Sequence, residues 1–199
     1  MKKLFIIGGM GAGKSTARKA LTDQGLPFID LDKVGHEIHK WDSVKQEIAA
    51  TFGEDVFGED GEIDRRKLAS KAFKSPADTR KLNRITMPRI EEVYTDRLDE
   101  LEKQGCEAVV VEYSVFKNRM SSLADTADVV IAVLAPLETR IERAVAAGWL
   151  EDDVRRRIAR QITDADRIDA ADVVFNNDAA PDDLRNKVIA WWSAYRETI

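Results

Sequence analysis

Continuous apolar runs along the chain alternate with segments whose apolar residues recur at helical spacing. Several runs are rich in β-branched residues, which is typical of central strands buried on both faces of a parallel sheet. The stretches that read as strands cover residues 4–7, 27–32, 108–111, 129–134 and 172–175. Helical patterns lie between these stretches and after the last of them. The alternation predicts an α/β fold built on a parallel sheet.

Residues 44–104 show helical patterns without a strong strand. The expected helices cover 44–52, 65–73 and 77–104, with a turn around 53–61. Pro88 is expected to kink or split the last helix, because proline lacks an amide hydrogen and clashes with the preceding turn. A helical block between the second and third strands indicates an insertion in the core.

The first strand leads into a glycine-rich loop that reads Gly8-Gly9-Met10-Gly11-Ala12-Gly13-Lys14-Ser15-Thr16. It fits the phosphate-binding pattern Gly-x-x-x-x-Gly-Lys-Ser. Its glycines let the backbone close around phosphate oxygens, and its amide hydrogens and the next helix N-terminus face the anion. Lys14 brings a positive charge to the β- and γ-phosphates, and the hydroxyl group of Ser15 can ligate magnesium. A strand before the motif and a helix after it favour real nucleoside triphosphate binding.

Acidic residues stand at the ends of two expected strands. Ligands of an open parallel sheet bind beyond the carboxyl ends of its strands, so Asp32 is expected near the phosphate loop. Asp32 could act as a base or orient magnesium and a hydroxyl group; alternatively, it caps a helix over 33–40. Asp30 is the less favoured candidate. Glu112 could face magnesium, or it could be an ordinary acid at a strand end.

Residues 148–167 are poor in large apolar side chains and rich in arginine. On a phosphoryl-transfer core, such a segment resembles a lid whose arginines neutralise the transferring phosphate and exclude water. The alternative is an exposed helix whose arginines pair with Glu151, Asp152 and Asp153 through contacts one turn apart. Both interpretations stay open at the level of the sequence.

The composition limits the class of protein. A chain of 199 residues suits one domain with a lid or insertion, and 44% hydrophobic with 34% charged residues fits a globular protein. The net charge of −5 argues against general binding to nucleic acid or membrane surfaces. The single cysteine, Cys106, excludes an intramolecular disulfide, and no apolar stretch approaches the ~20 residues of a membrane span. Without a signal peptide pattern, the protein is expected in the cytoplasm.

Several further motifs follow the phosphate loop in a fixed order, and together they resemble the dephospho-CoA kinase family. They are Gly25-Leu26-Pro27-Phe28-Ile29-Asp30-Leu31-Asp32, Phe52-Gly53-Glu54-Asp55, Gly61-Glu62-Ile63-Asp64-Arg65-Arg66-Lys67-Leu68, Leu82-Asn83-Arg84-Ile85 with Pro88, Arg157-Ile158-Ala159-Arg160-Gln161 and Phe175-Asn176-Asn177-Asp178. The similarity runs from about Leu4 to Trp192.

The resemblance implies a P-loop kinase core with a five-stranded parallel sheet flanked by helices, a helical substrate-binding insertion and a lid. The implied core covers about 1–32, 106–147 and 168–199, the acceptor-binding insertion about 33–105, and the lid about 148–167. The implied reaction is ATP-dependent phosphorylation of the ribose 3′-hydroxyl of dephospho-CoA, with Mg²⁺ bound to ATP. The expected assembly is a monomer or a weak homo-oligomer.

Site residues carry over from the family motifs by position. The ATP phosphates are expected on Gly11, Ala12, Gly13, Lys14, Ser15 and Thr16, with Lys14 also catalytic and Ser15 on the metal. Asp32 is the expected base and contacts the acceptor. Arg65 and Arg157 are further expected substrate-binding residues, and Gln161 lies with Arg157 in the lid.

The chain also departs from the family pattern. Met87 stands where a histidine usually precedes the proline, and Lys117 stands where an acid usually ends the motif after the third strand. Ala147-Gly148 replaces a lid Arg-Asp pair, for which Arg143 or the cluster 155–160 could substitute. Two alternatives to the family reaction therefore remain: a kinase of another small acceptor, such as a nucleoside or nucleotide, and an ATP-binding relative without catalysis.

Overall fold

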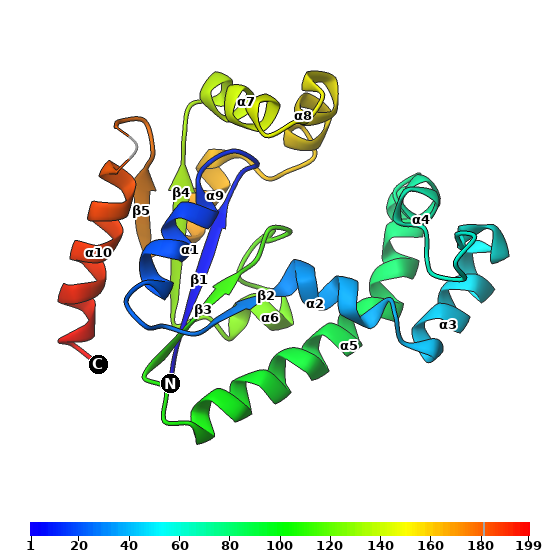
Figure 1. The fold of residues 1–199 in the computed structure, drawn as a ribbon, viewed down its shortest axis with the longest axis horizontal. Helices are drawn as coiled ribbons and strands as arrows, with labels where there is room; N and C mark the ends of the chain where they lie inside the picture. Colours follow the sequence, from blue (N-terminus) through cyan, green and yellow to red (C-terminus); the bar gives the residue numbers. More distant parts are fainter. Residues whose placement is uncertain (181) are drawn as a thin grey trace. The chain divides into compact units, whose positions relative to one another are not determined.

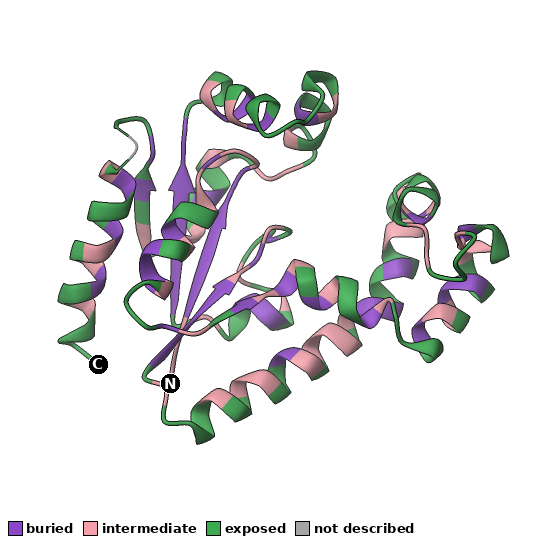
Figure 2. Ribbon diagram, in the orientation of Figure 1, coloured by how far each residue is buried: buried purple, intermediate pink, exposed green. Residues whose placement is uncertain are grey.

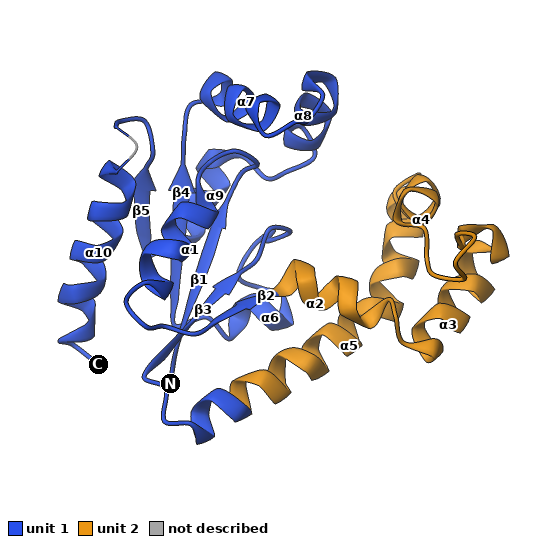
Figure 3. Cartoon of the chain, in the orientation of Figure 1, with its two compact units in different colours: residues 1–30, 100–199 blue, residues 31–99 orange. Residues whose placement is uncertain are grey.

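The computed structural model describes residues 1–180 and 182–199. Pro181, which the sequence pattern places at the start of the last helix, lies outside the described residues. The chain divides into two compact units (Figure 3). One unit comprises residues 1–30 and 100–199, and the other comprises residues 31–99.

A five-stranded parallel sheet forms the centre of the first unit (Figure 1). Its strands are β1 (Lys2–Gly8), β2 (Phe28–Asp30), β3 (Ala108–Glu112), β4 (Val129–Leu134) and β5 (Val173–Asn176), in the order β2-β3-β1-β4-β5. All the pairings are parallel. This sheet confirms the predicted α/β fold class. Because the strand order reverses direction at β1, the carboxyl end of β1 is the topological switch point where such sheets bind ligands.

Helices cover the sheet and extend beyond it. They are α1 (Lys14–Thr22), α6 (Ser122–Asp125), α7 (Leu137–Ala146), α8 (Glu151–Ile158), α9 (Asp164–Ala170) and α10 (Asp183–Arg196). Helices α1 and α10 contact each other, and α9 contacts β1 and β4. Among the described residues, none of the helices combines the length and the apolar character that crossing a bilayer needs.

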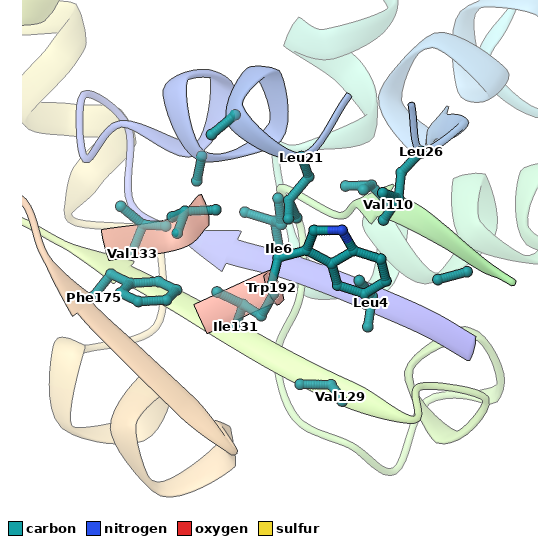
Figure 4. Packing of buried hydrophobic residues seen from close by; sticks show 14 of the residues in the cluster. Leu4, Ile6, Leu21, Leu26, Val110, Val129, Ile131, Val133, Phe175 and Trp192 are labelled. Carbon is teal, nitrogen blue, oxygen red and sulfur yellow. The ribbon is translucent and has the colours of Figure 1, made fainter. Parts of the chain in front are cut away.

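The main hydrophobic core lies between the sheet and the helices α1 and α10 (Figure 4). Figure 2 shows that buried residues run along β1, β3 and β4, which the apolar runs of the sequence predicted. Trp192 of α10 is only 2% exposed and is part of this core, and Trp191 stacks on Tyr195 with ring centroids 5.2 Å apart. Packing in this core holds β1 in place, and with it the start of the glycine-rich loop.

The second unit is helical and has a hydrophobic cluster of its own. Its elements are α2 (Leu31–Ile38), α3 (Asp42–Phe52), the short 3₁₀ helix η1 (Glu54–Val56), α4 (Arg65–Ala72) and α5 (Pro76–Lys103), the last of which continues into the first unit. The buried members of the cluster are Val44, Ile48, Val56, Leu68, Ala72, Leu82 and Ile85. Asp64 caps α4, because its side chain accepts hydrogen bonds from the backbone amides of Arg66 and Lys67.

Helix α5 is not split at Pro88. Side chains near the proline supply hydrogen bonds to backbone carbonyls in this part of the helix. The hydroxyl group of Thr86 donates to the carbonyl of Leu82 at 3.1 Å, and the guanidinium of Arg89 donates to the carbonyl of Ile85 at 3.1 Å. Helix α5 runs on through Pro88, so the split that the sequence pattern allowed is absent.

Candidate active site

The glycine-rich loop joins the end of β1 to the start of α1. Gly11 has φ of 75° and Gly13 has φ of 109°, a left-handed region that side chains other than glycine rarely adopt. Gly13 is the residue that precedes α1, so the amides of the first helical turn follow it directly. The loop therefore has the backbone form that directs amide hydrogens toward an anion.

Neighbouring elements press closely on this loop. A Cβ atom at Gly9 would lie 2.6 Å from the guanidinium carbon of Arg140, and one at Gly11 would lie 2.2 Å from the carbonyl oxygen of Arg140. A Cβ atom at Gly8 would lie 2.6 Å from the carbonyl oxygen of Val133. The glycines thus serve two purposes, because they allow both the backbone turn and the close approach of α7 and β4.

Lys14 folds back over the loop that precedes it. Its ammonium group donates to the carbonyl oxygens of Gly8 at 3.0 Å and Gly9 at 3.3 Å. These contacts hold the positive charge at the centre of the loop rather than out in solvent. A phosphate chain in the loop would meet this charge together with the loop amides.

A cavity of about 440 Å³ opens beside the loop. The residues that line it are Gly9, Gly11, Gly13, Lys14, Ser15, Thr16, Glu112, Arg143, Asn177 and Ala179. It brings together most of the residues that the sequence assigned to phosphate binding, although Ala12 itself is fully buried. Arg143, Asn177 and Ala179 come from α7 and from the chain after β5, far from the loop in sequence.

Arg140 of α7 holds one side of the loop. This side chain is buried, and its Nε donates to the carbonyl of Met10 at 3.2 Å while its Nη1 lies 3.3 Å from both carboxylate oxygens of Asp164. Asp164 also accepts a hydrogen bond from the buried Arg167 at 2.6 Å. Burial lowers the pKa of the Arg140 guanidinium, and the charge of Asp164 acts in the opposite direction.

Two amide side chains hold other parts of the loop. Oε1 of Gln161 accepts the backbone N–H of Met10 at 3.0 Å, and Nδ2 of Asn177 donates to the carbonyl of Ala12 at 2.9 Å. The backbone N–H of Asn177 in turn donates to the carbonyl of Leu134 at 2.7 Å, which ties it to the end of β4. The loop is therefore bonded to three distant parts of the chain, a pattern that favours one fixed conformation.

Glu112 ends β3 and lines the same cavity as Ser15. An oxygen of its carboxylate lies 3.2 Å from Nε of Arg18, and the Arg18 guanidinium stands 4.5 Å from the centre of the Phe28 ring. The hydroxyl oxygen of Ser15 and the carboxylate oxygens of Glu112 are the hard donors that magnesium prefers. No group of three or more His, Cys, Asp and Glu side chains suited to a metal occurs in the described parts of the chain. The donor set therefore fits a magnesium ion that takes its remaining ligands from phosphate and water.

The other residues proposed from the sequence lie outside the lining of this cavity. Asp32 is half-buried and is the second residue of α2, so it does not precede the helix as a capping residue would. Arg65 is exposed and is the first residue of α4. Arg157 is exposed on α8, with its guanidinium 4.5 Å from the centre of the Trp149 ring.

The remaining arginines of the segment 148–167 take different surroundings. Arg155 pairs with Glu151 at 2.8 Å and with Glu138 at 3.1 Å, and Arg156 pairs with Asp153. The pairs with Glu151 and Asp153 are among the contacts that the sequence offered as the alternative to a lid, and such exposed pairs contribute little to stability. Arg167 is instead buried against Asp164, where it supports the loop through Arg140.

The comparisons with known proteins agree over nearly the whole chain. A family model for dephospho-CoA kinase matches residues 4–183. A dephospho-CoA kinase of Corynebacterium glutamicum is 38% identical over 195 residues, which cover 96% of each sequence. A dephospho-CoA kinase of Corynebacterium jeikeium is 40% identical over 196 residues, which cover 96% of this chain and 98% of that protein.

Solved structures show the same fold. TT1252 from Thermus thermophilus superposes with a TM-score of 0.84 at 26% identity, covering 100% of this chain and 98% of that one. The dephospho-CoA kinase from Campylobacter jejuni superposes with a TM-score of 0.74, covering 100% of this chain and 99% of that one, and at 22% identity this likeness concerns the fold alone. From the match of its sequence over residues 4–183 and its curated relatives, the chain belongs to the dephospho-CoA kinase family.

Proposed function

We propose that this protein transfers the γ-phosphoryl group of ATP to the ribose 3′-hydroxyl of dephospho-CoA, giving coenzyme A and ADP. The observation that carries the proposal is the complete phosphate-binding loop, which lines a cavity with Lys14, Ser15 and Glu112 in a chain of this family. The kinase chemistry of the family uses ATP with a divalent metal ion, and we infer magnesium from the oxygen donors present. We place the reaction in the cytoplasm.

In this reaction the 3′-hydroxyl oxygen forms a bond to the γ-phosphorus while the bond from that phosphorus to the β–γ bridging oxygen breaks. ADP leaves with the bridging oxygen, and the hydroxyl proton passes to a base. Ser15 and Glu112 would hold a magnesium ion, which would supply positive charge to the phosphates. Lys14 and the loop amides provide fixed charge and dipoles where negative charge is redistributed, which is the main source of acceleration in phosphoryl transfer.

We assign the role of base to Asp32. Its support is the matched Asp-x-Asp motif and its place in the first turn of α2, two residues beyond the last residue of β2. A carboxylate there would accept the 3′-hydroxyl proton and orient the oxygen for in-line attack. Asp30, which pairs in register with Glu112, stays the second candidate.

We also assign acceptor binding to the helical segment of about 33–105 and closure of the site to about 148–167, with the core in about 1–32, 106–147 and 168–199. Arg65 would bind an anionic group of the acceptor, and Arg157 would approach the substrates from α8. The helical unit supports the first assignment, because it has a hydrophobic cluster of its own on which a binding surface can be built.

The experiment that tests the proposal measures ADP release with Mg-ATP and a panel of acceptors: dephospho-CoA, nucleosides and nucleotides. The proposal expects turnover that depends on dephospho-CoA, with the new phosphate on the 3′-oxygen by phosphorus NMR of the product. Preference for a nucleoside would mean that this protein phosphorylates a different acceptor from the one proposed. The departures from the family pattern at Met87 and Lys117 would be consistent with that result. ATP binding without turnover on any acceptor would indicate a relative that has lost catalysis.

A further inference from the structure

We propose that Arg18 is a positioning residue for the metal ion of the reaction, because it holds the carboxylate of Glu112 at the cavity that Ser15 also lines. This inference rests on the proposed function, in which Ser15 and Glu112 are the residues assigned to magnesium. Arg18 lies outside the lining of that cavity, so it acts through Glu112 and not by touching a substrate.

The two oxygen donors come from different elements of the first unit. Ser15 is the second residue of α1, whereas Glu112 is the last residue of β3. Magnesium demands near-octahedral geometry with short bonds, so two donors on separate elements have to be held closely in place. An interaction that joins α1 to the end of β3 would therefore serve the metal site.

Arg18 makes such a connection. It stands about one turn after Ser15 on α1, because residues three positions apart are neighbours on a helix surface. Its Nε lies 3.2 Å from a carboxylate oxygen of Glu112, and the two side chains are only 26% and 16% exposed. Partial burial strengthens this attraction relative to a pair in open solvent. The helix that carries Ser15 therefore also holds Glu112.

The aromatic ring of Phe28 supports the same guanidinium. The Cζ atom of Arg18 stands 4.5 Å from the centre of the ring, which is within the range of a cation–π interaction. Phe28 is the first residue of β2 and pairs in register with Val110 of β3. Arg18 is thus in contact with side chains of two neighbouring strands, which restricts its movement away from Glu112.

The surroundings of Glu112 are rich in negative charge. Asp30 and Glu112 pair in register at the carboxyl ends of β2 and β3, and residues in register direct their side chains to the same face of a sheet. Like charges placed side by side on neighbouring strands repel each other. A triphosphate in the cavity would add to this repulsion. The positive charge of Arg18 offsets it and so allows Glu112 to stay at the cavity.

The contact with Arg18 leaves Glu112 able to serve a metal ion. Nε of Arg18 is buried and has no hydrogen-bond partner among the described residues, so its contact with Glu112 is an ion pair without the alignment of a hydrogen bond. A carboxylate has about four lone-pair sites. Glu112 can therefore be held by Arg18 and still direct an oxygen toward magnesium or one of its waters.

Loss of charge and loss of position have opposite effects on metal binding. Removal of a positive charge near a cation site would by itself strengthen the binding of the cation. Removal of a residue that orients a metal ligand weakens metal binding, by about 10–100-fold. The direction of the change in metal affinity therefore separates a positioning role of Arg18 from a purely electrostatic one.

The test compares Arg18→Met and Arg18→Lys with Lys19→Met, a matched loss of an exposed charge on the same helix. Calorimetry measures binding of the non-hydrolysable imido analogue of ATP, without acceptor, in Mg²⁺ and in EDTA. The ratio of the two affinities is the gain from the metal. Titration with Mn²⁺ in the presence of the analogue, followed by electron paramagnetic resonance, measures the affinity for the ion itself.

We expect Arg18→Met to lower both the gain from the metal and the Mn²⁺ affinity by about tenfold or more. Arg18→Lys keeps the charge but not the planar guanidinium, so it should recover part of the loss. Lys19→Met should stay within about twofold of the unchanged protein, because its charge is exposed and pairs with Asp23.

A double variant shows whether Arg18 acts through Glu112. Glu112→Gln alone should lower the gain from the metal by a similar factor. Arg18→Met added to Glu112→Gln should then change the gain by less than about twofold, because residues that act as one unit are not additive. Additive losses in the double variant would overturn the proposal.

An unchanged or increased gain from the metal in Arg18→Met would also overturn the proposal, and so would an unchanged gain in Glu112→Gln. Thermal unfolding identifies a variant that fails to fold. If Arg18→Met fails to fold, Arg18→Lys decides, because its gain must still lie below that of the unchanged protein by more than about twofold. Because binding is measured without acceptor, a failure of the dephospho-CoA reaction would leave this result readable by itself.

Discussion

The side-chain amide of Asn177 donates to the carbonyl of Ala12 at 2.9 Å, which joins the end of β5 to the phosphate loop across 165 positions of sequence. The approach is so close that a Cβ atom at Gly13 would lie 2.3 Å from Nδ2 of Asn177. The loop conformation is therefore a property of the whole sheet and not of the glycine-rich sequence alone.

Replacing Asn177 should loosen the loop. In Asn177→Ala, the buried carbonyl of Ala12 loses its donor, which we expect to cost about 1–3 kcal/mol of unfolding free energy and to raise KM for ATP. Denaturant unfolding and steady-state kinetics measure the two effects. The control is Asn186→Ala, a change of an exposed residue on α10, and equal behaviour of the two variants would refute the role of Asn177.

Gly11→Ala should abolish ATP binding for a steric reason. The new Cβ atom would lie 2.2 Å from the carbonyl oxygen of Arg140, in addition to the strain of a side chain at φ of 75°. Gly105 has the same φ of 75° but open space around it, so Gly105→Ala isolates the strain, about 1–2 kcal/mol. Isothermal titration with ATP should show binding in Gly105→Ala and none in Gly11→Ala. Retained ATP binding in Gly11→Ala would mean that the loop does not need this close approach.

The helical unit should lose stability in acid through Asp64. Hydrogen bonds from the backbone amides of Lys67 and Arg66 lower the pKa of this carboxyl group. A lowered folded-state pKa means that the stabilisation is complete above the unfolded value near 3.9 and disappears as the pH falls through the folded value. Asp64→Asn keeps an acceptor without titrating, so its thermal midpoint should fall less than that of the unchanged protein between about pH 5 and pH 2. An equal fall of the thermal midpoint with pH in the two proteins would contradict this role of Asp64.

Trp192→Ala should destabilise the core between the sheet and α10. The side chain is 2% exposed, and a buried tryptophan replaced by alanine costs about 3–5 kcal/mol because it leaves a cavity. Trp41 is 37% exposed, so Trp41→Ala should cost clearly less. Urea unfolding monitored by circular dichroism measures both, and similar losses would show that burial does not set the difference.

The parts of the fold and of the site that are formed by residues close together in the sequence could be predicted. The apolar runs predicted the strands of the sheet. The phosphate-binding loop with Lys14 and Ser15 could be predicted because its glycines, lysine and serine stand at the fixed spacing that phosphate binding requires. The second strand was expected to reach Asp32, but β2 ends at Asp30 and α2 starts at Leu31, because strand and helix patterns overlap there. Pro88 was expected to kink or split its helix, and the split is excluded because α5 is one continuous helix.

The supporting residues of the loop were harder to find. At the level of the sequence, Asn177 was only a member of the motif 175–178, although a polar residue directly after a strand was a usable signal. Arg143 entered only as one of several substitutes for a missing lid arginine, because its partner Asn177 lies 34 residues away. Such contacts depend on strand order, and single-sequence patterns do not contain that order.

The central claim is tested most directly by ADP release from Mg-ATP with and without dephospho-CoA, measured for the unchanged protein and for Asp32→Asn. The account predicts release that depends on dephospho-CoA and falls by about 10²–10⁴ in Asp32→Asn, because a general base contributes on that order. Normal turnover in Asp32→Asn would mean that another residue acts as the base. ATP binding with no release on addition of dephospho-CoA would contradict the proposed reaction itself.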